Sequence, residues 1–497
     1  MANFPILLIT LLLPLISAIY IIVFVKQSKN PAKILFVKYV AGLSSALTLV
    51  SAAYLVAHFN RESSLYQYVE NYPWLESIGL DISLGLDGIS VFFVFLTALL
   101  TLICIAISMY SITKNIKEFL VCFLMLECFS IGVFCSTNLL LFYIFFEAIL
   151  VPMYVIIGMW GGKDRIYATI KFFLYTLFGS VLFLLDVVFL FNKFGTLSIE
   201  ALTELAPTLP LEVQIYLWSA AFIAFAVKVP MFPLHTWLPD AHVQAPTAGS
   251  VILAGVLLKV GAYGFLRISL PMFPLASIYF AQPVLILSLI AIIYASLVAI
   301  AQTDMKKVIA YSSIAHMGYV TAGIFSFTSE GITGAIMQMI SHGVVSAALF
   351  IVVGFLYDRL HTKEIAAYGG VAKKMPVLAS FFMVFTLSSI GLPGTSGFVG
   401  EFFAIIGIYR VSFYYAFFAA SGMIFGAIYM LRLYRNLMLG TITNEEVQGF
   451  KDLSGREIWC LLPLVLLTIF IGLCPNFVTK FYANNVMLIV ESMSVLR

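Results

Sequence analysis

Charged side chains are scarce in this sequence. Lys, Arg, Asp and Glu together make up 10% of the 497 residues, whereas hydrophobic side chains make up 62%. Soluble domains carry about 25% charged residues, so the composition excludes a series of soluble domains. The formal net charge is only +3, which excludes the strongly basic surface of a nucleic-acid-binding protein, and no nucleic-acid partner is expected.

Motifs that hold cofactors are absent from the sequence. There is no phosphate-binding P-loop, no GxGxxG run after a predicted strand and no zinc-ligand spacing. The cysteines form no CxxC pair and lie in or beside apolar runs, so we predict inert core thiols rather than disulfides or metal ligands. They are Cys104, Cys122, Cys128, Cys135, Cys460 and Cys474. We therefore expect this chain to hold no cofactor or metal of its own.

Long apolar runs make up most of the chain instead. About 20 apolar residues cross a membrane once as a helix, so the runs predict an all-α polytopic membrane protein with about fourteen transmembrane helices. The predicted spans are roughly 4–25, 36–57, 89–109, 118–136, 138–160, 166–191, 215–233, 248–270, 280–302, 306–326, 331–357, 377–407, 411–439 and 457–475. The first span has lysines after it and no basic residue before it, so it is predicted to be retained and not cleaved as a signal peptide.

The distribution of basic residues tests this count. With fourteen spans, most of the 27 lysine and arginine residues fall in loops on one side of the membrane. Positive loops face the cytoplasm, so both termini are predicted to lie on the opposite side. On that side residues 61–87 form a polar, aromatic segment to which the sequence assigns no role. The tail after Pro475 is predicted to contain no long amphipathic helix of the kind that lies along a membrane.

Spans four to eight and nine to thirteen form two sets of five. Because five is odd, the second set begins on the opposite side from the first, which is the condition for an inverted repeat. Each set has a predicted helix break at its fourth member, at residues 228–233 and 390–397. The predicted organisation is residues 1–117 as three N-terminal helices, 118–270 as a first repeat, 271–440 as a second, inverted repeat, and 441–497 as a loop and C-terminal helix.

Two lysines lie at membrane depth around the first break. Lys228 ends an apolar run two residues before Pro230, and Lys259 lies midway along the next run. An ionisable residue inside a span is costly and marks an ion or proton pathway by default. A broken helix is tolerated in lipid only where protein or a water-filled cavity covers the freed backbone. Both features point to transport.

Further titratable residues in apolar runs extend this pattern. Glu147 is near the middle of a predicted span, and Glu401 follows the second break. A carboxylate near Lys228 stabilises the ammonium form, so a Glu147/Lys228 pair that opens and closes would gate a proton. Histidine suits a relay because it titrates closest to neutral pH. The predicted proton-transfer residues are Glu147 and Lys228 as the gate, Lys259, His316 and His342 as relays, and Glu401 as the exit group.

Structural alternatives stay open for each of these residues. Lys228 can extend from a helix end toward water, and Lys259 can belong to a structural ion pair. A buried histidine is as often a hydrogen-bonded core residue as a relay. The remaining polar candidates are predicted to be structural, peripheral or at an entrance, and they are Glu127, Asp186, His235 and His242.

Several ungapped runs resemble one known family. The runs are 146–154 (FEAILVPMY), 226–250 (AVKVPMFPLHTWLPDAHVQAPTAGS), 310–318 (AYSSIAHMG) and 392–402 (LPGTSGFVGEF). They are similar to the antiporter-like membrane subunits of respiratory complex I, the NADH:quinone oxidoreductase. The similarity extends from about the third span to the thirteenth. Long ungapped motifs make this resemblance highly specific.

The resemblance implies a fold, partners and a division of labour. The fold would have fourteen helices with two inverted five-helix repeats and no redox centre in this chain. NADH, flavin, iron–sulfur clusters and quinone would be bound by partner subunits, and this chain would translocate protons in response. The expected partners are the other complex I membrane subunits, including sister antiporter-like chains, and the lipid bilayer.

The resemblance also implies roles for individual residues. It makes Glu147 and Lys228 the gating pair, Lys259 the central relay and Glu401 the exit group, and it matches His316 and His342 to the family's histidines. The glutamate at the exit position, Glu401, resembles that of one type of antiporter-like subunit. The two sister types carry lysine at this position. The absence of a long amphipathic extension also argues against the longest sister type.

Three alternatives from other classes remain at this point. The chain could be a stand-alone cation (sodium)/proton antiporter, or a subunit of one, and such antiporters share much of this machinery. It could be a membrane cytochrome with His316 and His342 as haem ligands, although the buried lysines would then have no role. It could also be a scaffold subunit. The overall similarity favours a bacterial inner membrane over a mitochondrial one.

Overall fold

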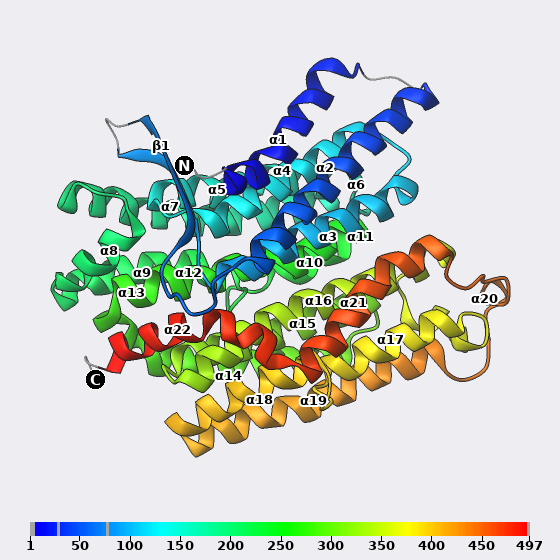
Figure 1. The fold of residues 1–497 in the computed structure, drawn as a ribbon. Coiled ribbons are helices and arrows are strands. Elements are labelled where there is room, and N and C mark those ends of the chain that lie inside the picture. The colour runs from blue at the N-terminus through cyan, green and yellow to red at the C-terminus, as the bar shows by residue number, and fades with distance from the viewer. Residues whose placement is uncertain (1–4, 27–29, 76–78, 495–497) are drawn as a thin grey trace. The chain divides into compact units, whose positions relative to one another are not determined.

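The computed structural model describes residues 5–26, 30–75 and 79–494 (Figure 1). Within these residues, thirteen helical segments are long and apolar enough to cross a membrane. Eleven of the thirteen are single, uninterrupted helices. They are α1 (Ile6–Phe24), α2 (Pro31–Ala57), α3 (Ser90–Ser111), α4 (Ile116–Cys135), α7 (Arg165–Phe194), α9 (Leu211–Lys228), α14 (Pro274–Ala301), α15 (Met305–Phe325), α16 (Ser329–Leu360), α19 (Phe413–Met438) and α21 (Gly455–Leu473).

The other two of the thirteen spans are interrupted. One is α5 (Leu139–Ala148) followed by α6 (Leu150–Trp160), and the other contains α11 (Thr247–Ile252), α12 (Leu258–Gly264) and α13 (Leu270–Met272). In the first, Pro152 has no N–H to donate to the carbonyl of Ala148, four residues earlier, which accounts for the interruption between α5 and α6. The helices not counted as spans are α8 (Ile199–Leu205), α10 (Trp237–Gln244), α17 (Pro376–Ser389), α18 (Ser396–Val411), α20 (Glu445–Gln448) and α22 (Pro475–Ser494).

Both predicted helix breaks are present. Helix α9 ends at Lys228, and the chain turns before α10 begins at Trp237. The predicted span 377–407 is divided into α17 and α18. Between them Gly391 and Gly394 have φ angles of +75° and +91°, a region that only glycine enters without strain. The predicted fourteen spans thus correspond to thirteen long helical segments and this broken pair.

The polar segment before α3 forms a small sheet that the sequence analysis does not predict. Strands β1 (Gln67–Leu75) and β2 (Leu80–Leu86) pair antiparallel. Next to them, Arg267 donates from Nε to the hydroxyl of Tyr66 at 2.7 Å and lies 3.4 Å from Asp87 through Nη2. Burial raises the pKa of Tyr66 to about 12, so its phenol stays protonated at neutral pH. This cluster anchors the segment to the helical turn that carries Arg267.

The tail after Pro475 is helical, which the sequence analysis does not predict. That this tail holds no long amphipathic helix lying along a membrane stays a prediction. Residues Pro475–Ser494 form α22. Its buried side chains recur every three or four residues and include Phe481, Asn485 and Ile489. Polar residues such as Asn484 interrupt the apolar run, so the tail has a helical period without the continuous hydrophobicity of a span.

The chain divides into two compact units. One comprises Met1–Val229, Val256–Phe280 and Lys480–Arg497, and the other comprises Pro230–Gly255 and Ala281–Thr479. The first unit contains Glu147, Lys228 and Lys259, and the second contains the two predicted relay histidines and Glu401. The inverted repeat of residues 118–270 and 271–440 stays a prediction, as do the predicted domain boundaries.

Candidate functional site

In the first unit, Lys228 lies at the end of α9 and is almost fully buried, with 4% of its surface exposed. It interacts electrostatically with Glu147, near the end of α5, but the two side chains do not form an ion pair. The Lys228 ammonium instead lies 4.7 Å from the centroid of the Phe146 ring. This is the geometry of a cation–π contact. The Lys228 side chain therefore contacts the residue directly before Glu147.

Aromatic rings surround this pair. Phe225, on α9, lies with its ring centroid 5.9 Å from that of Phe146 and 5.1 Å from that of Phe183. All three rings are buried. Glu147 is half-buried, and its Oε1 is enclosed without a hydrogen-bond partner among the residues that the structure describes. A carboxylate and an ammonium in such apolar surroundings interact strongly, because little water screens them.

Lys259 lies on α12 and is completely buried. Two π-helical turns flank this helix, at Leu253–Leu257 and Phe265–Ser269. Helix α12 packs closely on α9, because a Cβ added at Gly261 would lie 2.6 Å from the carbonyl oxygen of Phe225 and 2.9 Å from Cβ of Lys228. π-Helical turns are frequent at functional sites. The backbone around Lys259 is therefore irregular on both sides and closely packed between them.

In the second unit, four helices bring polar side chains together. His316, on α15, lies 2.7 Å through Nδ1 from Oε1 of Glu401, on α18. Its Nε2 lies 3.2 Å from the hydroxyl of Ser389, at the end of α17. Gln338, on α16, donates from Nε2 to the same Glu401 oxygen at 3.2 Å. His316 and Glu401 are 7% and 2% exposed, so this network is enclosed by protein.

A small cavity adjoins the network. It has a volume of about 10 Å³, and its lining includes His316, His342 and Gln338 together with several serines. That volume approaches what one water molecule occupies. The two histidine rings lie with centroids 5.7 Å apart. The geometry thus places two histidines on a water-sized space, and one of them, His316, contacts Glu401.

The helices approach closely enough to form this network because of small residues. A Cβ added at Gly400 would lie 2.4 Å from Oε1 of Gln338, and one at Gly334 would lie 2.2 Å from the backbone nitrogen of Ala404. Both contacts join α16 to α18. Glycines at these points let the backbones pack at short range, as in other membrane helix pairs. Glu401 follows Gly400 directly and is positioned by the same contact.

The structure brings together most of the predicted site residues within each unit. Glu147 and Lys228 are in electrostatic range, and His316, His342 and Glu401 form one cluster. The sequence analysis misses Gln338 and Ser389. Gln338 lies one helical turn before His342 in an apolar run, and this spacing is the signal that places both on one face of α16. Ser389 has no comparable signal.

The four polar residues that the sequence analysis predicts to be structural, peripheral or at an entrance lie in separate local environments. Glu127 is fully buried and accepts a hydrogen bond from Ser45 at 3.0 Å. His242 stacks on Phe350 with ring centroids 4.4 Å apart. Asp186 and His235 are 1% and 3% exposed. None of these observations connects them to either cluster.

The haem interpretation has no support in the geometry. Both ring nitrogens of His316 are engaged, one with Glu401 and one with Ser389, so binding to iron would break one of these contacts. Across the described parts of the chain, no group of three or more His, Cys, Asp or Glu side chains is arranged to hold a metal ion.

Comparison with known proteins agrees with the fold. The profile of the family described as "NADH:quinone oxidoreductase/Mrp antiporter, TM" matches residues 136–428. NADH-quinone oxidoreductase subunit M of Rickettsia conorii is 60% identical over 486 residues, which cover 98% of this chain and 99% of that protein.

Two solved structures have the same fold. A chain of respiratory complex I from Thermus thermophilus with bound NADH is 29% identical, with a TM-score of 0.89 over 98% of this chain and 99% of that one. A chain of the Mrp complex from Dietzia sp. is 19% identical, with a TM-score of 0.85 over 99% of this chain and 98% of that one, and this likeness is one of fold alone. The present chain therefore belongs to the NADH:quinone oxidoreductase/Mrp antiporter family, as an antiporter-like M subunit.

Proposed function

We propose that this chain is a proton-translocating membrane subunit of a bacterial NADH:quinone oxidoreductase. The observation that carries the proposal is the buried hydrogen-bonded network of His316, Glu401 and Gln338, in a helix bundle that crosses the membrane. Such a network is costly to bury and suits groups that exchange protons. The close similarity to an M subunit supports the coupling to NADH oxidation.

Glu147 and Lys228 are the gate in this proposal. When the two side chains meet, the pair is stabilised by charge attraction; when they separate, both are left in apolar surroundings. Breaking a buried pair costs about 3–5 kcal/mol. Moving one charge against a membrane potential of roughly 150–200 mV costs about 3.5–4.6 kcal/mol. Because the two energies are similar, opening the pair can control a proton that moves against the potential.

Lys259 and the second cluster serve the later steps. Lys259 is the proposed central relay, His316 and His342 receive the proton, and Glu401 releases it. The order of these proton-transfer steps follows the family resemblance. Within the second cluster it is supported by the direct contact between His316 and Glu401 at 2.7 Å.

Partner subunits supply the redox chemistry. NADH, flavin, iron–sulfur clusters and quinone bind to other subunits, and electron transfer there drives the conformational changes at the gate. The membrane partners are sister antiporter-like chains. This chain contributes proton transfer only, through its own titratable side chains.

The test uses the assembled complex in membrane vesicles. Lys228→Ala removes the gating ammonium, so NADH-driven proton uptake is expected to fall roughly tenfold or more, equivalent to at least about 1.4 kcal/mol of barrier. The matched control is Lys193→Ala, which removes an exposed lysine at the end of α7. Uptake that stays normal in Lys228→Ala, with the chain present in the complex, would show that Lys228 has a structural role.

A further inference from the structure

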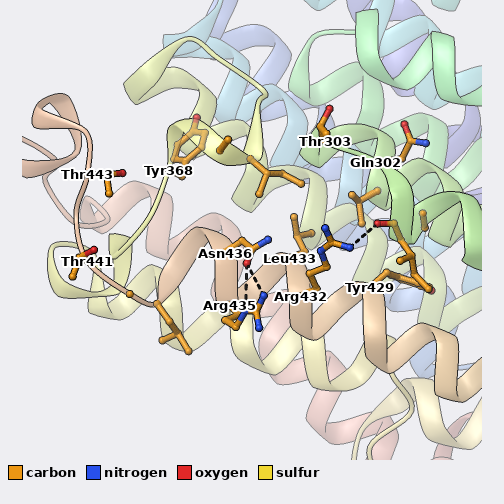
Figure 2. Close-up of a pocket in the computed structure, with 17 residues that line it drawn as sticks. Gln302, Thr303, Tyr368, Tyr429, Arg432, Leu433, Arg435, Asn436, Thr441 and Thr443 are labelled. Carbon is orange, nitrogen blue, oxygen red and sulfur yellow. Dashed lines mark hydrogen bonds between the residues drawn. The ribbon is translucent and has the colours of Figure 1, made fainter.

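A cavity of about 550 Å³ lies beside the C-terminal end of α19 in the second unit (Figure 2). Its walls come from the end of α14, the start of α15, the segment around Tyr368, and α19 with the loop that follows it. Its polar lining includes Arg432, Arg435 and Asn436. None of these residues belongs to the proposed proton path, and the proposal below is independent of that path.

The two arginines are held in place but keep hydrogen-bond donors. Arg432 donates from Nη1 to the carbonyl of Ile300 at 3.2 Å, near the end of α14. Arg435 donates from Nε and Nη2 to Oδ1 of Asn436, both at 3.3 Å, as Figure 2 shows. Within the described residues neither guanidinium forms an ion pair. Because each guanidinium has five N–H donors, most of this donor capacity remains for a bound anion.

The cavity lies where a membrane surface is expected. Arg432 and Arg435 are one helical turn apart on α19 and precede a loop on the positively charged side of the predicted topology. The neighbouring surface toward the membrane is apolar, with Ile428 45%, Leu431 44% and Leu297 49% exposed. A molecule that fills the cavity and covers this surface must have an anionic head and an apolar tail.

We propose that this cavity binds the phosphate headgroup of an anionic phospholipid. The planar guanidinium of arginine can donate to two phosphate oxygens at once. Basic pockets between helices on the cytoplasmic side bind acidic lipid headgroups. The threonine hydroxyls of Thr441 and Thr443 line the same cavity and add donors for a glycerol or phosphate oxygen. An acidic segment of a partner protein would satisfy the arginines but does not require the exposed apolar surface beside them, so the lipid fits better.

The experiment measures lipid retained by the intact complex. The complex is purified from wild-type membranes, exchanged into detergent with phosphatidylglycerol or phosphatidylcholine, and its bound lipid is measured by mass spectrometry. Arg432→Gln with Arg435→Gln is expected to weaken phosphatidylglycerol binding about thirtyfold, or about 1 kcal/mol per arginine. The matched control is Lys373→Gln with Lys374→Gln, which removes two exposed charges on the same side outside the cavity.

Further variants and ligands test whether the cavity binds a lipid or another molecule. Arg432→Lys with Arg435→Lys keeps the charge but loses the planar fork, so an intermediate loss is expected. Unchanged phosphatidylglycerol retention in the double glutamine variant, with the chain fully present in the complex, would overturn the proposal. So would equal retention of phosphatidylcholine, displacement of the lipid by inorganic phosphate alone, or a photoreactive group at Thr441 that labels a partner subunit instead of lipid.

Discussion

At the scale of single residues, the contact between His316 and Glu401 is central. The carboxyl and the imidazole lie 2.7 Å apart in a buried site, where electrostatic interactions are stronger than in water. Gln338 donates to the same carboxyl oxygen and keeps it beside the imidazole. Ser389 fixes the far side of the imidazole ring. In the proposed proton path, these contacts keep the carboxyl and the imidazole within hydrogen-bonding distance.

Glu401→Gln tests this interpretation. Glutamine has nearly the same shape and can bond to His316, but it does not titrate. NADH-driven proton uptake is therefore expected to fall roughly tenfold or more, with the complex still assembled. Glu401→Asp keeps a titrating group one methylene further away, and a partial recovery is expected. Both rates are measured in vesicles with a pH-sensitive dye.

A surface carboxylate provides the control for this experiment. Glu330 forms an ion pair with Arg410 at 2.5 Å, but Arg410 is 60% exposed. Exposed pairs contribute about 0–1 kcal/mol, so Glu330→Gln is expected to leave uptake close to the wild-type rate. An equal loss of proton uptake in Glu330→Gln and Glu401→Gln would show that removing any carboxylate has this effect, and that Glu401 has no special role.

Sequence reasoning identifies these residues but not their contacts. His316 and Glu401 stand out because titratable side chains are rare in apolar runs. Their separation of 85 positions means that only tertiary packing brings them together. Gln338 and Ser389 are uncharged, so they do not stand out in composition, and their roles become visible only once the four helices are in place.

At the scale of elements, irregular helices mark both clusters. Helix α12 lies between two π-helical turns, and α17 is separated from α18 by two left-handed glycines. Prolines and glycines in the sequence predict the breaks after α9 and α17, because they remove donors or permit unusual φ angles. The π-helical turns have no clear signal of this kind, because Phe265–Ser269 contains neither residue type and Leu253–Leu257 contains a single glycine. Strands β1 and β2 and helix α22 are not predicted either, because polar residues interrupt the hydrophobicity on which the span count rests.

Gly261→Ala tests the close packing of α12 on α9. The added methyl would lie 2.6 Å from the Phe225 carbonyl oxygen and 2.9 Å from Cβ of Lys228. Overpacking of this kind costs about 1–3 kcal/mol, so thermal denaturation of the purified complex is expected at lower temperature, with slower proton uptake. In the control Gly158→Ala, the nearest atom is 3.7 Å away. Normal stability of Gly261→Ala would contradict the close contact.

At the scale of the whole molecule, the charges of the loops set the topology. The basic loops lie on one side and Cys474, which follows α21, lies on the other by the predicted count of spans. Five of the six cysteines are buried, whereas Cys474 is exposed. The apolar runs predict the number and order of spans well, because hydrophobicity over about 20 residues is itself the physical requirement for crossing.

Thiol labelling tests this topology. A membrane-impermeant maleimide is expected to label Cys474 from the periplasmic side and not in inverted vesicles. A second variant, Glu445→Cys in a Cys474→Ser background, carries an exposed cysteine at the start of α20, before α21, and is expected to label only in inverted vesicles. Labelling of both positions from one side would contradict the assigned orientation.

The most direct test of the proton path is Lys259→Met in the assembled complex, with NADH oxidation and proton uptake measured together in the same vesicles. Methionine has a similar volume and no charge, and Lys259 is completely buried, so the change removes a titrating group with little change in packing. We predict that both rates fall together and that an uncoupler does not restore oxidation. Normal rates of both, with the chain present in the complex, would show that protons do not pass through Lys259.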